Sequence, residues 1–130
     1  MRQRAGVTKH VRVLNQTRGT VVAARCRVAR SYWSRMVGLI PVSHLDPGAG
    51  LLIPRTSAIT MWFMRTSIDV AFSRADGTVV ALARDLHPWR FTYWARGAKD
   101  ALELPVGAID ASGTQVGDVL AFEPFGGRAT

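Results

Sequence analysis

The sequence has few of the residues from which metal and redox sites are built. It contains one cysteine, Cys26, which excludes an intrachain disulfide and a metal site made of thiolates. Its three histidines, His10, His44 and His87, are isolated, with no second histidine or carboxylate at the spacing of a metal-binding motif. We therefore expect a protein with no metal site and no bound cofactor.

Sequence signatures of nucleotide-binding and hydrolytic enzymes are also missing. There is no P-loop, no GxSxG and no HExxH. Gly48-Ala49-Gly50 begins as a dinucleotide-binding motif does, but Ile53 occupies the position of the third glycine. Because no nucleophile is paired with a base, we assign no catalytic residue from the sequence.

Long apolar runs are absent as well. The longest, residues 79–83, has five residues, and Met61-Trp62-Phe63-Met64 has four, whereas a helix that spans a membrane needs roughly 18. The basic N-terminus is not followed by the continuous apolar region of a secretion signal. We therefore expect a cytoplasmic protein without a membrane span.

Acidic residues are missing from the first third of the chain. Residues 1–36 carry nine basic side chains and no acid, whereas residues 37–130 carry eight basic and nine acidic ones, which together give the net charge of +8. This asymmetry has two interpretations: a surface that binds nucleic acid or another polyanion, or a solvated face with a frayed tail. The first assigns a binding role to Arg2, Arg4, Lys9 and Arg12.

Cys26 lies in an alternating run, residues 21–28, between Arg25 and Arg27. Because neighbouring residues of a strand point to opposite faces, the thiol is predicted to point into the core and the two arginines away from it. We interpret Cys26 as a buried structural residue.

The clearest secondary-structure signal is a hairpin within residues 68–82. Ile68, Val70 and Phe72 alternate with smaller or polar residues, as in a strand with one buried face. Asp76-Gly77 supplies the positive-φ dipeptide of a tight turn, after which an apolar, β-branched run resumes. The apolar block at residues 61–64, just before this hairpin, predicts a strand that is buried on both faces.

Two further strands, at residues 10–14 and 20–28, are predicted to form a second hairpin. Short strands are also predicted at 51–53, 101–104 and 119–122, with an extended edge segment at 89–94 and one helical turn within 106–113. Ser31 is a candidate N-cap for a short helix near residues 32–39. Many short strands with few helices predict a mainly-β single domain, an antiparallel β-sandwich or barrel. We expect it to comprise residues 9–124, with loose tails at 1–8 and 125–130.

Three groups of residues are candidates for a site. Arg65 and Asp69 either form a buried ion pair or leave Arg65 free to bind a carboxylate or phosphate. The aromatic side chains of residues 89–94 either stack on sugars or bases, beside Arg90, or pack in the core. Glu103, an acid within an apolar strand, needs a cationic partner if it is buried, and Arg30, Arg65 and Arg90 are the candidates. The candidate ligand-binding residues are Thr60, Trp62, Met64, Arg65, Asp69, Trp89, Arg90 and Glu103.

These stretches resemble domain-of-unknown-function family 192, found in bacteria and archaea. The resemblance extends from about residue 11 to 122, and it rests on the segments at 29–39, 50–53, 63–72, 76–77, 88–91, 102–105 and 116–118. It implies a compact, jelly-roll-like β-sandwich with a short helix and no established activity. Relatives often carry His-Thr where this sequence has Thr60 and Met61, which argues against acid–base catalysis through that histidine here.

Three functional hypotheses follow from the sequence. The leading one is a non-catalytic accessory domain that binds a small molecule, a peptide or a protein partner. The second is nucleic-acid or polyanion binding through the arginine-rich N-terminal third. The third is an enzyme that uses Asp69, His87 or Glu103 as a general acid or base.

Overall fold

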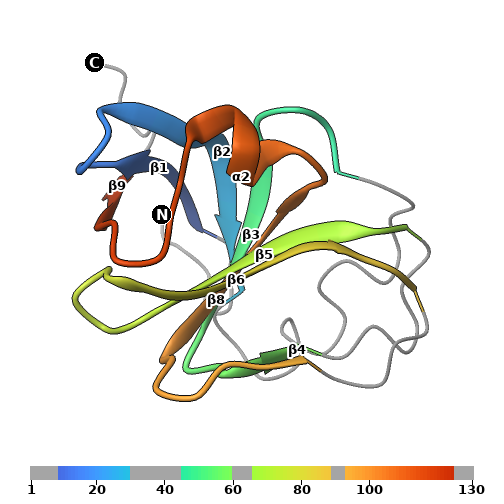
Figure 1. Ribbon diagram of the computed structural model, residues 1–130. Coiled ribbons are helices and arrows are strands. Elements are labelled where there is room, and N and C mark those ends of the chain that lie inside the picture. Colours follow the sequence, from blue (N-terminus) through green and yellow to red (C-terminus); the bar gives the residue numbers. More distant parts are fainter. Residues whose placement is uncertain (1–8, 30–44, 60–65, 89–92, 125–130) are drawn as a thin grey trace, which may run out of the picture.

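The computed structural model describes residues 9–29, 45–59, 66–88 and 93–124 (Figure 1). Most of them belong to one curled sheet of seven strands in the order β6-β5-β8-β3-β2-β1-β9. Its strands are β1 (Lys9–Asn15), β2 (Thr20–Val28), β3 (Ala49–Pro54), β5 (Ile68–Ser73), β6 (Val79–Leu86), β8 (Asp100–Pro105) and β9 (Leu120–Pro124). The remaining elements are a two-stranded ribbon, β4 (Ala58–Ile59) with β7 (Tyr93–Trp94), and the helix α2 (Ala108–Ser112). The predicted mainly-β fold is thus confirmed.

The sheet curls into a half-barrel whose two edges meet at one end. Thr78 bridges Val119 in antiparallel fashion, just before β6 and β9 begin. The Leu120 N–H also donates to the Gly77 carbonyl (2.9 Å), and the Gly117 N–H donates to Val79 (2.8 Å). Pairing the edges in this way satisfies backbone groups that an open sheet leaves exposed.

Both predicted hairpins are present. β1 pairs antiparallel with β2, and β5 pairs antiparallel with β6. The Asp76 carboxylate accepts the Thr78 N–H (2.9 Å), and Gly77 has φ of +94°. The turn chemistry read from the sequence therefore does form the connection between β5 and β6.

The sheet differs from the prediction in one pairing, because β2 and β3 run parallel. Parallel neighbours need a crossover of about a dozen residues or more, and the connection between these strands extends from residue 29 to residue 48. We expected only antiparallel pairing because the sequence has few long helices. The length of this connection, much of which lies outside the described residues, is the feature that permits the parallel pair.

The registers show which residues share a face of the sheet. Directly paired residues point to the same side, and the next residue along each strand points to the other side. One face carries the row Arg27, Leu51, Glu103, Val70 and Ala83. The opposite face carries the row Val28, Leu52, Leu102, Ala71 and Leu82.

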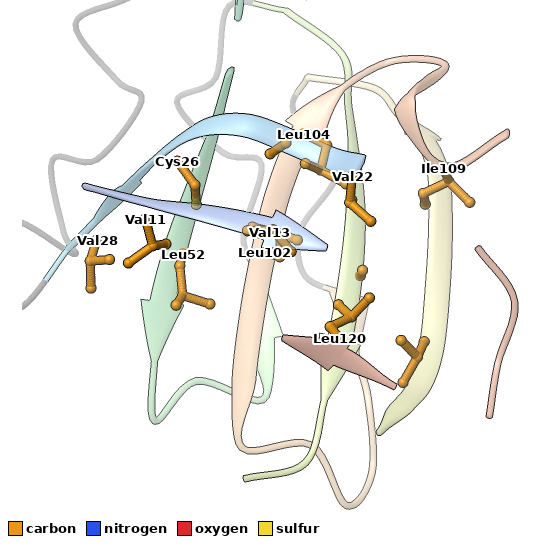
Figure 2. Close-up of a cluster of buried hydrophobic side chains, with 13 residues drawn as sticks. Val11, Val13, Val22, Cys26, Val28, Leu52, Leu102, Leu104, Ile109 and Leu120 are labelled. Atoms are coloured by element: carbon orange, nitrogen blue, oxygen red, sulfur yellow. The ribbon is translucent and has the colours of Figure 1, made fainter. Parts of the chain in front are cut away.

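Each face has its own hydrophobic cluster. The half-barrel interior, shown in Figure 2, takes side chains from β1, β2, β3, β8, β9 and α2, and among them Val13, Leu104 and Ile109 are fully buried. The other cluster lies on the opposite face, around Phe72 and Ile53. Two clusters explain why all six residues of β5 are buried, where the sequence predicted one buried face.

Cys26 belongs to the half-barrel interior, as its alternation with the arginines predicted. Its side chain is fully buried, and burial raises the pKa of the thiol to about 12. The thiol is therefore an unreactive core group.

Several sequence predictions lie outside the described residues: the helix near residues 32–39, the buried strand at 61–64, the tails at 1–8 and 125–130, and most of the edge segment at 89–94. In the part of the chain that the structure describes, no helix has the length and apolar character needed to cross a membrane.

The edge closure at Gly77 leads to a first prediction. A Cβ on Gly77 would lie 2.2 Å from the Leu120 carbonyl oxygen, which is much closer than non-bonded atoms approach, and φ there is +94°. We expect Gly77→Ala to lower the free energy of unfolding by about 3 kcal/mol or more, because strain and a backbone clash add together. Urea denaturation measures this loss.

Gly117→Ala is the matched control. Gly117 has φ of +99°, but a Cβ there would meet nothing within 4 Å. Its cost is the conformational strain alone, about 1–2 kcal/mol. Equal losses in the two variants would show that the Gly77–Leu120 contact does not constrain the fold.

Candidate functional site

The structure places two of the predicted site residues, Asp69 and Glu103, and it does not bring them together. Asp69 pairs with Leu104 across the β5–β8 ladder, whereas Glu103 pairs with Val70. Because successive strand residues alternate in direction, Asp69 and Glu103 point to opposite faces of the sheet. They do not share a cleft, which an acid–base pair acting on one substrate requires.

Asp69 is a structural anchor at the end of β5. Its side chain is buried, and one carboxylate oxygen, Oδ1, accepts the Asp85 N–H (2.9 Å). The other oxygen, Oδ2, accepts the N–H groups of Gly107 (3.1 Å) and Ile109 (3.2 Å) at the start of α2. These helix N–H groups have no partner within the helix, so the carboxylate caps it from a distant strand. Arg65, the predicted ion-pair partner, lies outside the described residues.

Glu103 lies in the middle of the sheet, on the face opposite Asp69. Its side chain is buried between Leu51 on β3 and Val70 on β5. Burial raises the pKa of the Glu103 carboxyl to about 8, and the positive charge of Arg27 opposes this shift without cancelling it. Arg27 belongs to the same cross-strand row, two strands away. The sequence suggested Arg30, Arg65 or Arg90 as the cation, and these residues lie outside the described part.

The other predicted site residues are Thr60, Trp62, Met64, Arg65, Trp89 and Arg90, which lie outside the described residues. The described residues next to them are paired at both ends. Ile59 pairs with Tyr93 in the ribbon, and Ile68 pairs with Leu86 in the hairpin. Residues 60–67 therefore connect β4 to β5, and residues 87–92 connect β6 to β7, so both connections join the ribbon to the hairpin.

Sequence analysis missed a small polar group at the hairpin end. The Ser67 hydroxyl lies 3.3 Å from His87 Nδ1, and Asp85 Oδ2 lies 3.4 Å from His87 Nε2. A serine and a carboxylate on the two ring nitrogens of a histidine is the arrangement that activates a nucleophile. Here, however, both contacts are long, and the side chains of His87 and Asp85 are 69% and 54% exposed. A group that is this exposed to water lacks the water-excluded setting in which such a serine is activated.

A surface depression of about 460 Å³ lies beside the β4–β7 ribbon. Its lining consists of Ser57, Trp94, Ala95, Arg96, Gly97, Ala98 and Lys99. Trp94 is 76% exposed, and the residue opposite it on β4 is Ala58, whose methyl group is too small to cover an indole ring. The structure therefore presents a large aromatic ring to solvent at the edge of a cavity.

A turn brings the two cations of this depression next to Trp94. The Ala98 N–H donates to the Ala95 carbonyl (3.2 Å), and Gly97 has φ of +84°, which glycine adopts without strain. The turn is held to the rest of the fold because the Ala95 N–H donates to Ser57 (2.9 Å) and the Lys99 N–H donates to Ser73 (2.8 Å). We name this depression, defined by its seven lining residues, the Trp94 site.

The two cations of the Trp94 site are not engaged in the ion pairs that several arginines of the described residues form with carboxylates. Ion pairs of arginine in the described residues include Arg12–Glu123 (3.1 Å), Arg18–Asp118 (2.9 Å) and Arg84–Asp110 (2.9 Å). Arg96 and Lys99 are exposed and take part in none of them. None of the seven lining residues is an acid.

Metal binding finds no support in the part of the chain that the structure describes. In residues 9–29, 45–59, 66–88 and 93–124, no group of three or more His, Cys, Asp or Glu side chains is placed to hold an ion. Asp85 and His87 supply two groups, which is fewer than the three or four protein ligands that zinc usually takes.

Comparison with known proteins identifies the family. The family model DUF192, described as an uncharacterized ACR, matches residues 13–122. The chain belongs to this family.

Archaeal proteins are similar to this chain in sequence, and a bacterial protein of known structure is similar to it in fold. A UPF0127 protein of Thermococcus sibiricus is 34% identical over 115 residues, which cover 85% of this chain and 74% of the relative. A UPF0127 protein of Pyrococcus furiosus is 35% identical over 111 residues, covering 83% and 95%. A Sinorhizobium meliloti protein, provisionally described as a transcription regulator, superposes with a TM-score of 0.77 at 20% identity, over 93% of this chain and 98% of its own. At that identity the likeness shows the fold alone.

The three bonds to Asp69 lead to a second prediction. Asp69→Asn replaces one acceptor oxygen by an NH₂ group, so at least one buried N–H loses its partner. The remaining hydrogen bonds go to a neutral amide oxygen in place of a charged carboxylate, which weakens them. We expect the free energy of unfolding to fall by roughly 2–4 kcal/mol in chemical denaturation.

Asp110→Asn makes the same chemical change at an exposed position. The Asp110 side chain is 73% exposed and pairs with Arg84. The loss of this exposed ion pair is expected to lower the free energy of unfolding by less than about 1 kcal/mol. If Asp69→Asn were as mild as this control, the capping role assigned to Asp69 would be wrong.

Glu103 leads to a third prediction, on pH dependence. Between its ordinary pKa of 4.5 and the raised pKa of about 8, the folded chain keeps a proton that the unfolded chain releases. The stability from this group is therefore complete below about pH 4.5 and is lost as the pH rises through about 8. At about 1.4 kcal/mol per pH unit, the loss amounts to at most about 5 kcal/mol.

Glu103→Gln removes the titrating group at nearly constant volume. We expect the variant to be more stable than the parent at pH 9 and to differ little from it near pH 4.5, as measured by denaturation across this range. Glu123→Gln, at a half-exposed surface position, is the control and should leave the pH profile of the parent unchanged. A parent profile that rises from pH 5 to 9 and is unaffected by Glu103→Gln would contradict the assignment.

Proposed function

We propose that this member of the DUF192 family is a non-catalytic binding domain that holds a small anionic ligand at the Trp94 site. The observation that carries the proposal is the depression itself, in which an exposed Trp94 lies beside Arg96 and Lys99, two cations that take part in none of the ion pairs given above for the described residues. Its volume of about 460 Å³ is within the roughly 300–1,000 Å³ of small-molecule sites. An accessory domain of this kind needs a ligand pocket but no nucleophile.

The chemistry of the lining supports an anion. Arg96 and Lys99 supply only hydrogen-bond donors and positive charge, and Ser57 supplies one hydroxyl group. With no carboxylate in the lining, a negatively charged group enters without repulsion. The anchored backbone at Ser57 and Ser73 keeps the turn in place, so binding spends little free energy on ordering it.

The residues predicted from the sequence remain candidates for an extension of this site. Trp94 belongs to the same ribbon from which residues 60–65 and 89–92 continue, since Ile59 pairs with Tyr93. We propose that Thr60, Trp62, Met64, Arg65, Trp89 and Arg90 contribute to binding from these two segments. Asp69 and Glu103 support the fold from the two faces of the sheet, and we assign them no direct contact with the ligand.

The alternative of a polyanion-binding N-terminal third receives less support. Of its arginines, Arg12 pairs with Glu123 and Arg18 forms a two-pronged contact with Asp118, through Nε (2.9 Å) and an Nη atom (3.1 Å). Arginines held by carboxylates lose part of their attraction for phosphate groups. Arg2 and Arg4 lie outside the described residues.

Anion binding is tested by removing the two cations of the Trp94 site. Titration of the parent with ribose 5-phosphate, followed by calorimetry at low ionic strength, should give saturable binding to one site. Arg96→Gln with Lys99→Gln removes the charge-assisted hydrogen bonds, and we expect at least a tenfold lower affinity, or about 1.4 kcal/mol.

A charge-matched control separates a local contact from general attraction. Arg25→Gln with Arg74→Gln removes the same net charge at two exposed arginines that do not line the site. This control should bind as the parent does, apart from the weak long-range effect that salt screens. Equal loss in both double variants, or no binding by the parent, would overturn the proposal.

A further inference from the structure

We infer that the ligand of the Trp94 site joins a planar ring to a phosphate, as a nucleotide does, with the ring stacked on Trp94 and the phosphate held by Arg96 and Lys99. This inference rests on the proposed function, which requires only an anion. It names the chemical class of the ligand and gives the aromatic ring its role.

The exposure of Trp94 is the first step. An indole with 76% of its surface in water carries a large apolar area that the fold leaves uncovered, and its neighbour across the ribbon is the small Ala58. A nearby alanine, Ala95, is buried and fixes the backbone, so the ring is held at the surface by a short paired strand. An aromatic face that is open to solvent, carried on a paired strand, is the kind of platform on which bases stack.

The second step is that the charged side chains of the lining can only donate hydrogen bonds. A neutral sugar offers both donors and acceptors, and its sites normally include carboxylates or amides that accept hydrogen bonds. Among the seven lining residues, the charged side chains are Arg96 and Lys99, and neither can accept a hydrogen bond. Phosphate oxygens need donors alone, which fits this set.

The third step is the arrangement of the two chemistries. Arg96 and Lys99 line the same cavity as Trp94, because the turn at residues 95–98 reverses the chain after β7. A ligand on the site therefore meets an aromatic face and two cations in one cavity, with Ser57 available to a hydroxyl group. A base joined to a phosphate through a ribose carries these three groups in one molecule.

This chemistry has two sources, a free mononucleotide and a single strand of nucleic acid, and the test separates them. Four probes are titrated into the full chain: inorganic phosphate, ribose 5-phosphate, adenosine monophosphate and a short single-stranded oligoadenylate. If the base stacks on Trp94, adenosine monophosphate binds roughly 5- to 100-fold more tightly than ribose 5-phosphate. Equal affinities for these two probes would overturn the inference.

Variants at position 94 assign the gain to the ring. Trp94→Leu keeps an apolar side chain without an aromatic face. It should lower the affinity for adenosine monophosphate to that for ribose 5-phosphate, and it should leave the affinity for inorganic phosphate unchanged. Trp94→Phe keeps a smaller ring and should retain part of the preference. A Trp94→Leu variant that still prefers adenosine monophosphate as the parent does would contradict stacking. Because Trp94 is exposed, these variants should unfold at the same temperature as the parent, which thermal melts check.

The oligonucleotide arm identifies the source, and the phosphate arm separates the two proposals. An affinity for oligoadenylate that exceeds that for the mononucleotide and falls steeply with salt indicates a nucleic-acid strand, whereas no gain indicates a free nucleotide. If inorganic phosphate and ribose 5-phosphate bind through Arg96 and Lys99 but the base adds nothing, the inference fails and the proposed function stands. If no phosphate compound binds, both fail.

Discussion

The Asp69 carboxylate joins three parts of the chain that are far apart in sequence. It lies on β5 and accepts N–H groups from Asp85 at the end of β6 and from Gly107 and Ile109 at the start of α2. Ile109 in turn packs into the half-barrel interior, so the position of the helix over that cluster depends on the same contact. Without this acceptor, buried N–H groups would lie unpaired next to an apolar core, which is among the more costly defects a fold can carry.

The two faces of the sheet carry different clusters of side chains. The interior of the half-barrel is closed by α2 and by the pairing of Gly77 with Leu120, and it holds a dense set of aliphatic side chains with Cys26. The opposite face holds Glu103 and the second cluster, which includes Ala95 and Ala98 from the Trp94 site. The helix α2 thus packs against one face through Ile109, and the turn that follows β7 packs against the other through Ala95 and Ala98.

The elements that the sequence predicted well are those governed by local chemistry. Asp76-Gly77 specified the turn between β5 and β6, and alternation around Cys26 specified which side chains face inward. The helical turn within residues 106–113 was also predicted, and it is α2. Each of these depends on residues within about ten positions of one another.

Features that depend on distant partners were not predictable from the sequence. The carboxylate of Asp69 binds backbone N–H groups, which every residue possesses, so no side-chain pattern marks its partners. The parallel pairing of β2 with β3 depends on the path of a long connection. Sequence analysis placed Trp94 within an aromatic segment but missed Arg96 and Lys99, because the turn that brings them to the ring involves a hydrogen bond between two alanines. The signal in the sequence was Arg96-Gly97-Ala98-Lys99, in which the glycine marks a turn between the two cations.

The pairing of β1 with β9 has a consequence for synthesis on the ribosome. β1 is made first and obtains β2 as a neighbour at once, but its second neighbour is the last strand of the described fold. Until residues 120–124 have emerged, one side of β1 is an open row of amide and carbonyl groups that another nascent chain can pair with. The register shifts of β1 occur in its pairing with β2, where β2 carries the extra residues, whereas β1 pairs with β9 residue by residue from Val11 to Asn15. The row that waits for β9 is therefore a regular template throughout this interval.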